Sequence, residues 1–347
     1  MSTQADLTVT PEPSGLHDPG RGEPILEVEQ LRVDFFTRQG TVHAVRDVSF
    51  TLAKGETLGI VGESGSGKSV TAQVLLGLVE LPGKVMGGDV RWKGESLLHG
   101  KHANRTLERV RGNEIAMIFQ DPMTSLNPVY TVGMQLTEVL RRHLKLDRQA
   151  ARKRAIELLD LVGIANPPAR IDQYPFEMSG GMRQRVLIAM ALACEPELLI
   201  ADEPTTALDV TIQAQILELI AELQQRLGLA VILITHDLGV VAGLCDRVAV
   251  MYAGKLVEIA SAADLYANPG HPYSRGLLRS TPRLDVVLPR LVAIDGAPPD
   301  LRRPPVGCSF VARCELSTAR CRQEAPVLEL KEEGRHVACW RAFETVA

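Results

Sequence analysis

The chain has 347 residues, 45% of them hydrophobic, and carries 38 Lys and Arg against 42 Asp and Glu, for a formal net charge of −4. This composition excludes an intrinsically disordered protein, and the mild acidity argues against nucleic acid as the main partner. The longest uncharged apolar runs, such as Val186–Cys194, are too short to cross a bilayer, and Met1–Arg21 lacks the apolar core of a signal peptide. We therefore expect a protein of the cytoplasm.

The predicted elements alternate between strands and helices. Residues 1–24 hold four prolines with scattered glycine and charge, and are expected to form a disordered tail. The apolar spacing then predicts, in chain order, strands at Ile25–Val33, Val42–Leu52 and Glu56–Val61, followed by helices at Ser69–Leu78, Val132–Leu144 and Arg148–Leu161. It continues with a helix at Val186–Ala193, a strand at Leu198–Ala201, a helix at Ile212–Leu227 and a strand at Ala230–Thr235. Such alternation is typical of an α/β fold with parallel strands.

Two stretches differ in character from this α/β pattern. Residues 127–175 read as a mainly helical insertion, which we place at about 121–185 with its flanks. Between about residues 265 and 306 eight prolines interrupt any long element, and four of the six cysteines follow. We therefore expect a main domain over 25–265 and a small C-terminal module over 266–347.

The clearest chemical motif is a glycine-rich loop between a predicted strand and a predicted helix. It matches the pattern GxxxxGK[ST], which binds phosphate in that setting. Glycines let consecutive backbone N–H groups and the helix N-terminus face an anion, the lysine can reach the β- and γ-phosphates, and the last hydroxyl can bind Mg²⁺. The loop consists of Gly62, Glu63, Ser64, Gly65, Ser66, Gly67, Lys68 and Ser69.

Three other stretches are ambiguous when taken singly. Asp202 and Glu203 end a buried strand, where they suit Mg²⁺ and a water-activating position but also a solvated turn. The run Ser179-Gly180-Gly181 at a helix start suits an anion or a simple helix cap. His236 follows a β-rich run, where a histidine is more often structural than catalytic. Each alternative stays open on these residues alone.

The order of these motifs resembles the ATP-binding cassette (ABC) ATPases over about residues 26–264. In that family they are the Walker A loop, the Q-loop (Gln120), the signature (Ser179-Gly180-Gly181), the Walker B strand, the D-loop (Ala207-Leu208-Asp209) and the H-loop (His236). The resemblance implies an ABC-type P-loop NTPase cassette, with a RecA-like core sheet, an antiparallel β region and a helical subdomain. The signature departs from the common form by having Met178 and Met182 where Leu and Gln are usual.

The resemblance also implies a mechanism that needs two cassettes. They meet head to tail, and each ATP lies between one Walker A loop and the signature of the other cassette. Glu203 would polarise the attacking water, His236 would hold the γ-phosphate and the water, and Gln120 would sense Mg²⁺ and nucleophile. Mg²⁺ would be held by Ser69, Gln120 and Asp202, while Ser179, Gly180, Gly181 and Asp209 would act in trans.

Two further features have open alternatives. An aromatic residue upstream of the Walker A loop is expected to stack on adenine, and Phe36 or Phe35 are candidates that could equally be core residues. The helical insertion is where the family docks onto membrane-embedded partners, although it also covers the sheet.

Several short stretches of the sequence resemble one branch of the family, the dipeptide and oligopeptide importers. The resembling stretches are Ile118–Pro128, Met178–Met190, Ala201–Gln215 and Asn268–Tyr273 with the Leu277-Leu278 and Thr281-Pro282 pairs that follow. The Gly-Met-Arg-Gln-Arg run suggests the D-type subunit, which implies an F-type cassette as heterodimer partner, two permease subunits, an extracytoplasmic binding protein and the cytoplasmic face of the plasma or inner membrane. Alternatives are import of nickel or an opine-like solute, a soluble ABC ATPase acting on nucleic acid or ribosomes, and a non-hydrolysing nucleotide sensor.

The C-terminal cysteines could hold a metal group. They are spaced C-x5-C-x6-C-x17-C at Cys308, Cys314, Cys321 and Cys339. A disulfide framework does not suit a reducing cytoplasm, and zinc sites favour tighter pairs. Four thiolates can bind a [4Fe–4S] cluster, which some members of the branch carry here, so we expect Fe–S, with zinc or free thiols as alternatives. Cys194 and Cys245 lie in apolar helical contexts and read as core thiols.

Overall fold

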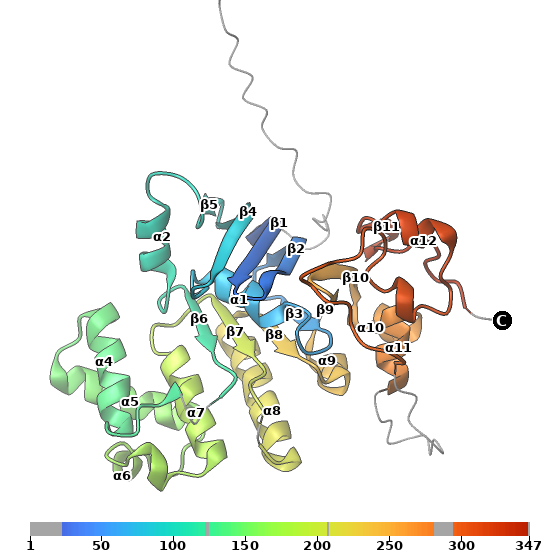
Figure 1. Cartoon of the computed structure of the whole chain (residues 1–347). Helices are drawn as coiled ribbons and strands as arrows, with labels where there is room; N and C mark the ends of the chain where they lie inside the picture. The colour runs from blue at the N-terminus through green and yellow to red at the C-terminus, as the bar shows by residue number, and fades with distance from the viewer. Residues whose placement is uncertain (1–22, 122–124, 207, 281–293, 346–347) are drawn as a thin grey trace, which may run out of the picture.

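The computed structural model describes residues 23–121, 125–206, 208–280 and 294–345 (Figure 1). The predicted tail, residues 1–24, lies outside them except for its last two residues, and Pro24 already begins the first strand. Part of the Q-loop segment, residue 207 of the D-loop and the Thr281-Pro282 pair also lie outside the described residues.

The N-terminal half begins with an antiparallel sheet of order β2-β1-β4-β5. Its strands are β1 (Pro24–Thr37), β2 (Gly40–Ala53), β4 (Gly83–Trp92) and β5 (Glu95–Ser96). Alternate apolar residues of β1 and β2 are buried, as predicted for half-buried strands. Both strands extend beyond their predicted ends because a tight turn pairs Thr37 with Gly40.

The second sheet has eight strands in the order β11-β12-β10-β9-β3-β8-β7-β6. Five of them are parallel, as expected: β3 (Thr57–Val61), β6 (Ile115–Ile118), β7 (Leu198–Asp202), β8 (Ala230–Thr235) and β9 (Arg247–Tyr252). Antiparallel pairing adds β10 (Lys255–Ser261), β12 (Arg335–Val337) and β11 (Glu329–Glu332). Four of these strands, β3, β7, β8 and β9, are buried along their whole length, which is typical of strands covered on both faces.

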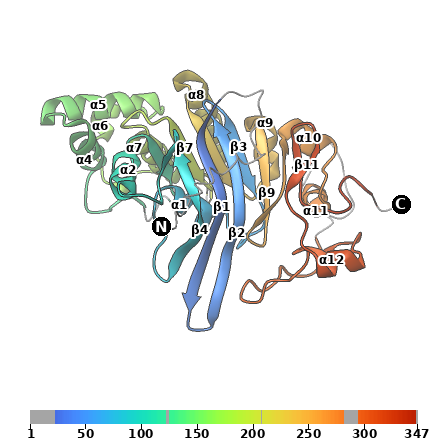
Figure 2. The same ribbon diagram turned by 90° about the horizontal axis from the view of Figure 1, so that it is seen from above.

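Helices pack around this sheet in two groups on opposite sides of the molecule (Figures 1 and 2). The predicted helical insertion contains α4 (Val132–Leu144), α5 (Arg148–Leu161), α6 (Pro167–Arg170) and η2 (Pro175–Glu177), and leads into α7 (Gly180–Ala191). The C-terminal extension contains α11 (Pro272–Ser280), η3 (Val311–Arg313) and α12 (Ala319–Gln323). The remaining helices are α1 (Lys68–Leu75), α2 (Ala103–Val110), α8 (Val210–Leu227), α9 (Leu238–Leu244) and α10 (Ala262–Ala267).

Two apolar cores hold these parts together. One lies between the two sheets and includes the fully buried Trp92 and Phe50. The other joins the core sheet to the helices α4, α5, α7 and α8. The helical insertion is therefore packed onto the sheet that carries the predicted site. Because the core between them is close-packed, a displacement of one part shifts the other.

The C-terminal extension continues the core sheet, although its sequence reads as a separate module. Strand β12 pairs with β10, and the fully buried carboxylate of Glu258 on β10 accepts hydrogen bonds from the backbone N–H groups of Gly270 and His271. These bonds satisfy a charge that burial would otherwise disfavour. In the part of the chain that the structure describes, no helix has the length and apolar character needed to cross a membrane.

Candidate functional site

The glycine-rich loop leaves the end of β3 and opens α1, as its sequence predicts. Two of its glycines are required by close backbone approach. A Cβ at Gly62 would lie 2.1 Å from the carbonyl oxygen of Met251, and a Cβ at Gly67 would lie 2.5 Å from that of Ala44. Both have positive φ, 154° and 104°. The loop therefore packs tightly against β9 of its own sheet and against β2 of the N-terminal sheet.

Some polar groups of this loop have partners within the chain and others do not. Gly67 caps α1 without a side-chain hydrogen bond, and the buried hydroxyl of Ser66 has no hydrogen-bond partner among the described residues. Lys68 donates to the carbonyl oxygens of Gly62 and Glu63 at 2.8 and 3.1 Å. Burial lowers the pKa of Lys68, while the nearby Glu203, Asp202 and Glu63 raise it. This arrangement fits an anion such as a triphosphate.

Asp202 and Ser69 meet at the end of β7. The hydroxyl of Ser69 donates to Asp202 at 2.9 Å, although the two residues lie 133 positions apart. Burial raises the pKa of Asp202, an effect opposed by the hydrogen bond from Ser69. A hydroxyl beside a buried carboxylate is an oxygen donor pair of the kind that Mg²⁺ prefers, so these two residues fit the cation predicted here.

Glu203 is the centre of a second group of polar side chains. Its carboxylate accepts hydrogen bonds from Gln120 at 3.0 Å and Thr206 at 2.9 Å, and lies 3.3 Å from Nδ1 of His236. Its φ is 46°, in a region that residues other than glycine rarely adopt, and its N–H donates to Ile234 on β8. Such a backbone conformation is typical of functional positions.

The structure therefore brings the predicted catalytic residues together around one carboxylate. Gln120, Glu203 and His236 come from the ends of three strands of the same sheet, β6, β7 and β8. The sequence analysis did not include Thr206, which completes the set of Glu203 partners. Its position three residues after Glu203, in the turn that follows the strand, is a signal that could have identified it.

The signature and D-loop residues do not join this group within one chain. Ser179 caps α7, and its hydroxyl accepts a hydrogen bond from the N–H of Met182 at 3.3 Å. Asp209 caps α8 in the same way through Ile212 at 3.0 Å. Both caps are exposed, as is the neighbouring Val210 at 83%. Ser179 therefore acts as a helix cap, and the N-termini of α7 and α8 lie on the surface.

The two candidate stacking residues differ in environment. Phe36 is 45% exposed at the end of β1, and the ammonium of Lys84 lies 5.7 Å from its ring centre. Phe35 is half-buried and packs against the core between the two sheets. An exposed ring is free to stack on a base, which favours Phe36 as the candidate and gives Phe35 the role of a core residue.

The four C-terminal cysteines line one small cavity, together with His271, Phe310 and Trp340. All four are free thiols. Burial, with a smaller contribution from neighbouring cysteines, raises the pKa of Cys308 and Cys339 to about 11 and also raises that of Cys314. Nevertheless, no group of three or more His, Cys, Asp or Glu side chains is arranged to hold a metal ion in the described residues. Cys194 and Cys245 are buried in the core, as predicted.

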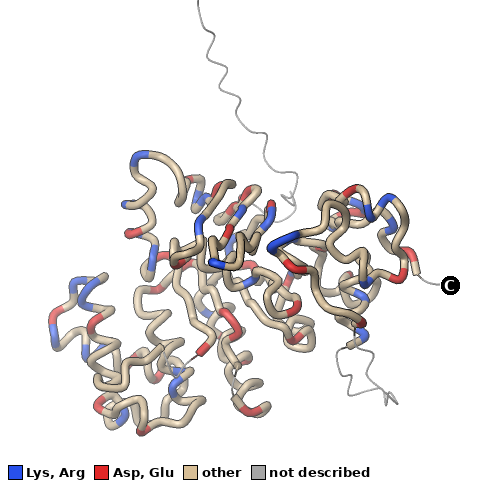
Figure 3. The backbone as a smooth tube through the Cα atoms, in the orientation of Figure 1, with Lys and Arg blue, Asp and Glu red and all other residues tan. Residues whose placement is uncertain are grey.

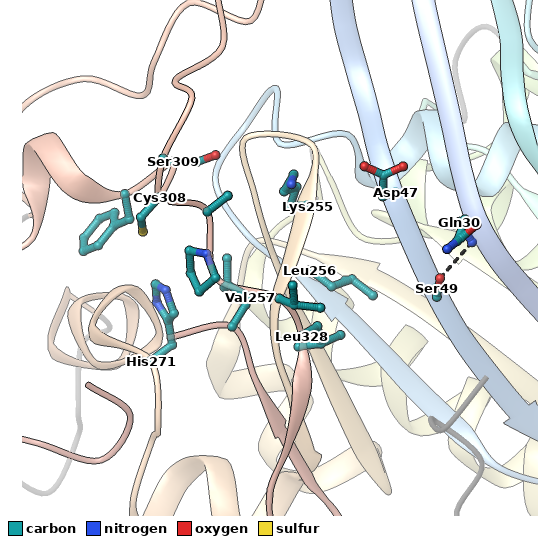
Figure 4. A pocket seen from close by; sticks show the side chains of 16 residues that line it. Gln30, Asp47, Ser49, Lys255, Leu256, Val257, His271, Cys308, Ser309 and Leu328 are labelled. Atoms are coloured by element: carbon teal, nitrogen blue, oxygen red, sulfur yellow. Dashed lines mark hydrogen bonds between the residues drawn. The ribbon is translucent and has the colours of Figure 1, made fainter. Parts of the chain in front are cut away.

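A cavity of about 300 Å³ adjoins the cysteine cavity, since His271 and Cys308 line both, and lies between the N-terminal sheet, β10 and the C-terminal extension (Figure 4). Asp47, Ser49 and Lys255 lie at its polar side, with Ser49 accepting from the N–H of Gln30 at 2.8 Å. Leu256 and Leu328 line its apolar side. Its lining includes no residue of the glycine-rich loop, so it is distinct from the phosphate site.

Two family models match the chain. The model described as "ABC transporter" matches residues 45–206, which span the loop, the carboxylates and the signature. The model described as "Oligopeptide/dipeptide transporter, C-terminal region" matches residues 257–321, which include three of the four clustered cysteines. The first match lies within residues 25–265, and the second begins at residue 257 and runs into the C-terminal extension.

Named relatives and solved structures agree with these models. The chain is 54% identical to a dipeptide transport ATP-binding protein of Bacillus subtilis, over 92% of this chain and 95% of the relative. It is 50% identical to an oligopeptide transport ATP-binding protein of Salmonella typhimurium, over 99% of both. The dimeric ATP-binding cassette MJ0796 bound to ADP and phosphate matches with a TM-score of 0.61 and 26% identity, over 68% of this chain and 98% of the cassette. A subunit of a Clostridium perfringens ABC transporter complex matches with a TM-score of 0.60 and 30% identity, over 71% and 92%. The chain belongs to the ABC transporter family, among the ATP-binding subunits of its dipeptide and oligopeptide branch.

Proposed function

We propose that this chain is the ATP-hydrolysing subunit that powers import of dipeptides or oligopeptides through partner permease subunits. The observation that carries the proposal is the polar network around Glu203, which joins three strand ends beside the phosphate-binding loop. Relatives at 50–54% identity are named for dipeptide and oligopeptide transport, which supports the peptide cargo.

Each residue of the site has a specific role in this proposal. Residues 62–69 and the N-terminus of α1 bind the phosphates, while Phe36 stacks on the base. Ser69, Asp202 and Gln120 would hold Mg²⁺, which when bound would offset the charge of the phosphates. Glu203 orients the attacking water and draws its proton, and His236 holds the water and the γ-phosphate in place. The 3.3 Å approach of His236 to Glu203 supports this division of roles.

The second half of the site is proposed to come from another cassette. Ser179, Gly180 and Gly181 would present the N-terminus of α7 to the γ-phosphate bound by the partner, and Asp209 would link the two composite sites. The exposure of Ser179, Gly180, Asp209 and Val210 supports an intermolecular role, because capping alone does not require an open surface. We propose an F-type cassette as the partner in a heterodimer.

The helical subdomain is proposed to dock onto the two permease subunits at the cytoplasmic face of the membrane. Large apolar side chains are exposed on it, namely Val129 at 70%, Met134 at 57% and Phe176 at 65%. Exposed apolar groups of this kind are typical of protein contacts. Lys and Arg are interspersed with Asp and Glu along the described chain (Figure 3), which does not favour a nucleic-acid partner.

The proposal is tested by co-purification and transport. The chain is expressed with its neighbouring permease subunits, second cassette and extracytoplasmic binding protein, and ATP-dependent uptake of a labelled dipeptide is measured in vesicles. We expect the chain to be recovered with the permeases and uptake to require Mg·ATP. Uptake of nickel but not of peptides would reject the cargo, and recovery on ribosomes or DNA would reject the transport function.

We further propose that Cys308, Cys314, Cys321 and Cys339 bind a [4Fe–4S] cluster. Their convergence on one cavity supports the proposal. Iron, when bound, would stabilise the thiolate form of these side chains. Zinc and free thiols are the competing assignments, and zinc would need the four thiols to surround a single ion.

Anaerobic purification tests the cluster directly. We expect iron and acid-labile sulfide in the wild type, and their loss in Cys321→Ser. Cys194→Ser is the matched control, because Cys194 is buried outside the cysteine cavity and should not change the iron content. Zinc as the only metal, or the absence of both metals, would contradict the proposal.

A further inference from the structure

Glu63, the second residue of the phosphate-binding loop, is held by two residues from far along the chain. Its N–H donates to the hydroxyl of Tyr273 at 2.9 Å. Its carboxylate accepts hydrogen bonds from both terminal nitrogens of Arg313, at 2.7 and 2.9 Å. Tyr273 lies on α11 and Arg313 ends η3, so both belong to the C-terminal extension. The extension therefore contacts the loop directly.

The guanidinium of Arg313 is itself fixed by its surroundings. All five of its N–H groups are engaged, because it also donates to the carbonyl oxygens of Ile294 and Asp295 and to the hydroxyl of Tyr252. Only 5% of its side chain is exposed. A planar guanidinium bound in this way holds a carboxylate in one position, which a lysine ammonium does not.

Glu63 passes this constraint on to the catalytic part of the loop. Its carbonyl oxygen accepts hydrogen bonds from the ammonium of Lys68 at 3.1 Å and from the N–H of Ser66 at 3.2 Å. Movement of Glu63 would therefore shift the lysine and the turn whose N–H groups face the phosphate. A misplacement of about 1 Å can cost on the order of 100-fold in an enzyme site.

We propose that Arg313 is a positioning residue for the nucleotide site. It acts through Glu63 to keep the phosphate-binding loop in its binding conformation, so that the C-terminal extension sets the affinity for Mg·ATP. The inference rests on the proposed function of residues 62–69. A contact that only attached the extension to the cassette would affect stability and leave nucleotide affinity unchanged.

A double-mutant cycle in the full chain tests this role. The variants are Arg313→Ala, Glu63→Gln and their combination, with Arg313→Lys as a conservative change. Binding of a fluorescent ATP analogue and KM and kcat for hydrolysis with the partner cassette are measured. We expect each single variant to weaken binding and raise KM about tenfold with a smaller change in kcat, and the double variant to lose no more than either single one. Arg313→Lys should rescue only in part.

The control is Arg302→Ala, which removes an exposed ion pair with Asp300 in the same extension and should leave affinity unchanged. Circular dichroism and thermal melting report folding, and if Arg313→Ala fails to fold, Arg313→Lys and Glu63→Gln complete the test. Wild-type affinity in these folded variants, or additive losses in the double variant, would overturn the inference. Lys68→Ala separates failure of the proposed function from failure of this inference. If Lys68→Ala binds ATP like the wild type, the loop is not the nucleotide site. If Lys68→Ala loses ATP binding while the Arg313 variants bind normally, only the positioning role is rejected.

Discussion

The two halves of the proposed nucleotide site differ in how completely one chain builds them. On the side of the phosphate-binding loop, Ser69 contacts Asp202, and Glu203 contacts Gln120 and His236. On the signature side, the polar side chains only cap their own helices and face solvent. One half is a network within the chain, and the other is a surface that needs a second cassette to become a site.

Burial explains why the first half is organised in this way. Lys68 and Asp202 are 5% and 4% exposed, and a buried charge is tolerated only when other groups satisfy it. The partners of Lys68 are the carbonyl oxygens of Gly62 and Glu63, and the partner of Asp202 is the hydroxyl of Ser69. Packing of the loop and of the start of α1 against the end of β7 therefore assembles these groups together. The exposed residues of the signature half have no such cost, and water can satisfy them until a partner arrives. The following predictions test this difference.

Replacement of Glu203 should have the largest effect. Glu203→Gln keeps the size of the side chain but removes the carboxylate that draws a proton from water, so hydrolysis should fall by about 100-fold or more. Binding of ATP should persist, and the closed dimer should accumulate in size-exclusion chromatography with Mg·ATP. Glu218→Gln, on the exposed face of α8, is the control and should hydrolyse normally. Wild-type turnover in Glu203→Gln would show that another group activates the water.

Replacement of Lys68 should act on binding. Lys68→Ala removes the ammonium that lies inside the loop, and we expect the affinity for Mg·ATP to fall on the order of 100-fold. Equilibrium binding to the isolated chain measures the loss without any need for a partner. Lys101→Ala, at an exposed position, should bind normally. Equal affinities of these two variants would mean that the loop is not the phosphate site.

Replacement of Ser179 should affect function only when the second cassette is present, whereas replacement of Lys68 affects the isolated chain. We expect Ser179→Ala to bind ATP normally as an isolated chain but to dimerise and hydrolyse about tenfold less well with the second cassette. It also loses a helix cap worth about 1 kcal/mol. Ser261→Ala removes a comparable cap from α10 and controls for that loss. If both variants hydrolysed equally well, the signature surface would have no role in trans.

The smallest effect concerns the pH dependence of stability through His271. This residue supports α11, since its Nδ1 accepts from the N–H of Tyr273, and burial lowers its pKa to about 3. Below pH 6.5 the unfolded chain therefore binds a proton that the folded chain does not, and stability falls as the pH falls. From pH 7 to pH 5 this contributes a loss of about 2 kcal/mol.

Comparison with His271→Gln isolates this contribution. Glu258 has its pKa raised by burial, which favours the folded state on acidification and opposes the histidine. Glu258 is present in both proteins, so the difference between their losses of unfolding free energy, measured by urea denaturation at pH 7 and pH 5, belongs to His271. An identical pH dependence would show that His271 is not held neutral by burial.

Elements with strong local signals were predicted to the residue. The helices Val132–Leu144 and Arg148–Leu161 match α4 and α5, and the strand Ala230–Thr235 matches β8. In the two helices the apolar spacing agrees with an N-cap, Thr131 or Asp147, whose side chain accepts a backbone N–H. The helix start at Ser179-Gly180-Gly181 is also confirmed, since Ser179 caps α7, although the apolar spacing alone marked this helix only from Val186.

The sequence by itself determined the chemistry of this protein. The glycine-rich loop, the two carboxylates and the signature each consist of residues that lie close together in the chain. The spacing within each motif is therefore enough to indicate which groups act together. Only the tertiary structure decided that β12 joins the core sheet and that Arg313 donates hydrogen bonds to Glu63, 250 positions away. Contacts of this separation follow from the packing of whole elements, and no local pattern of residues encodes them.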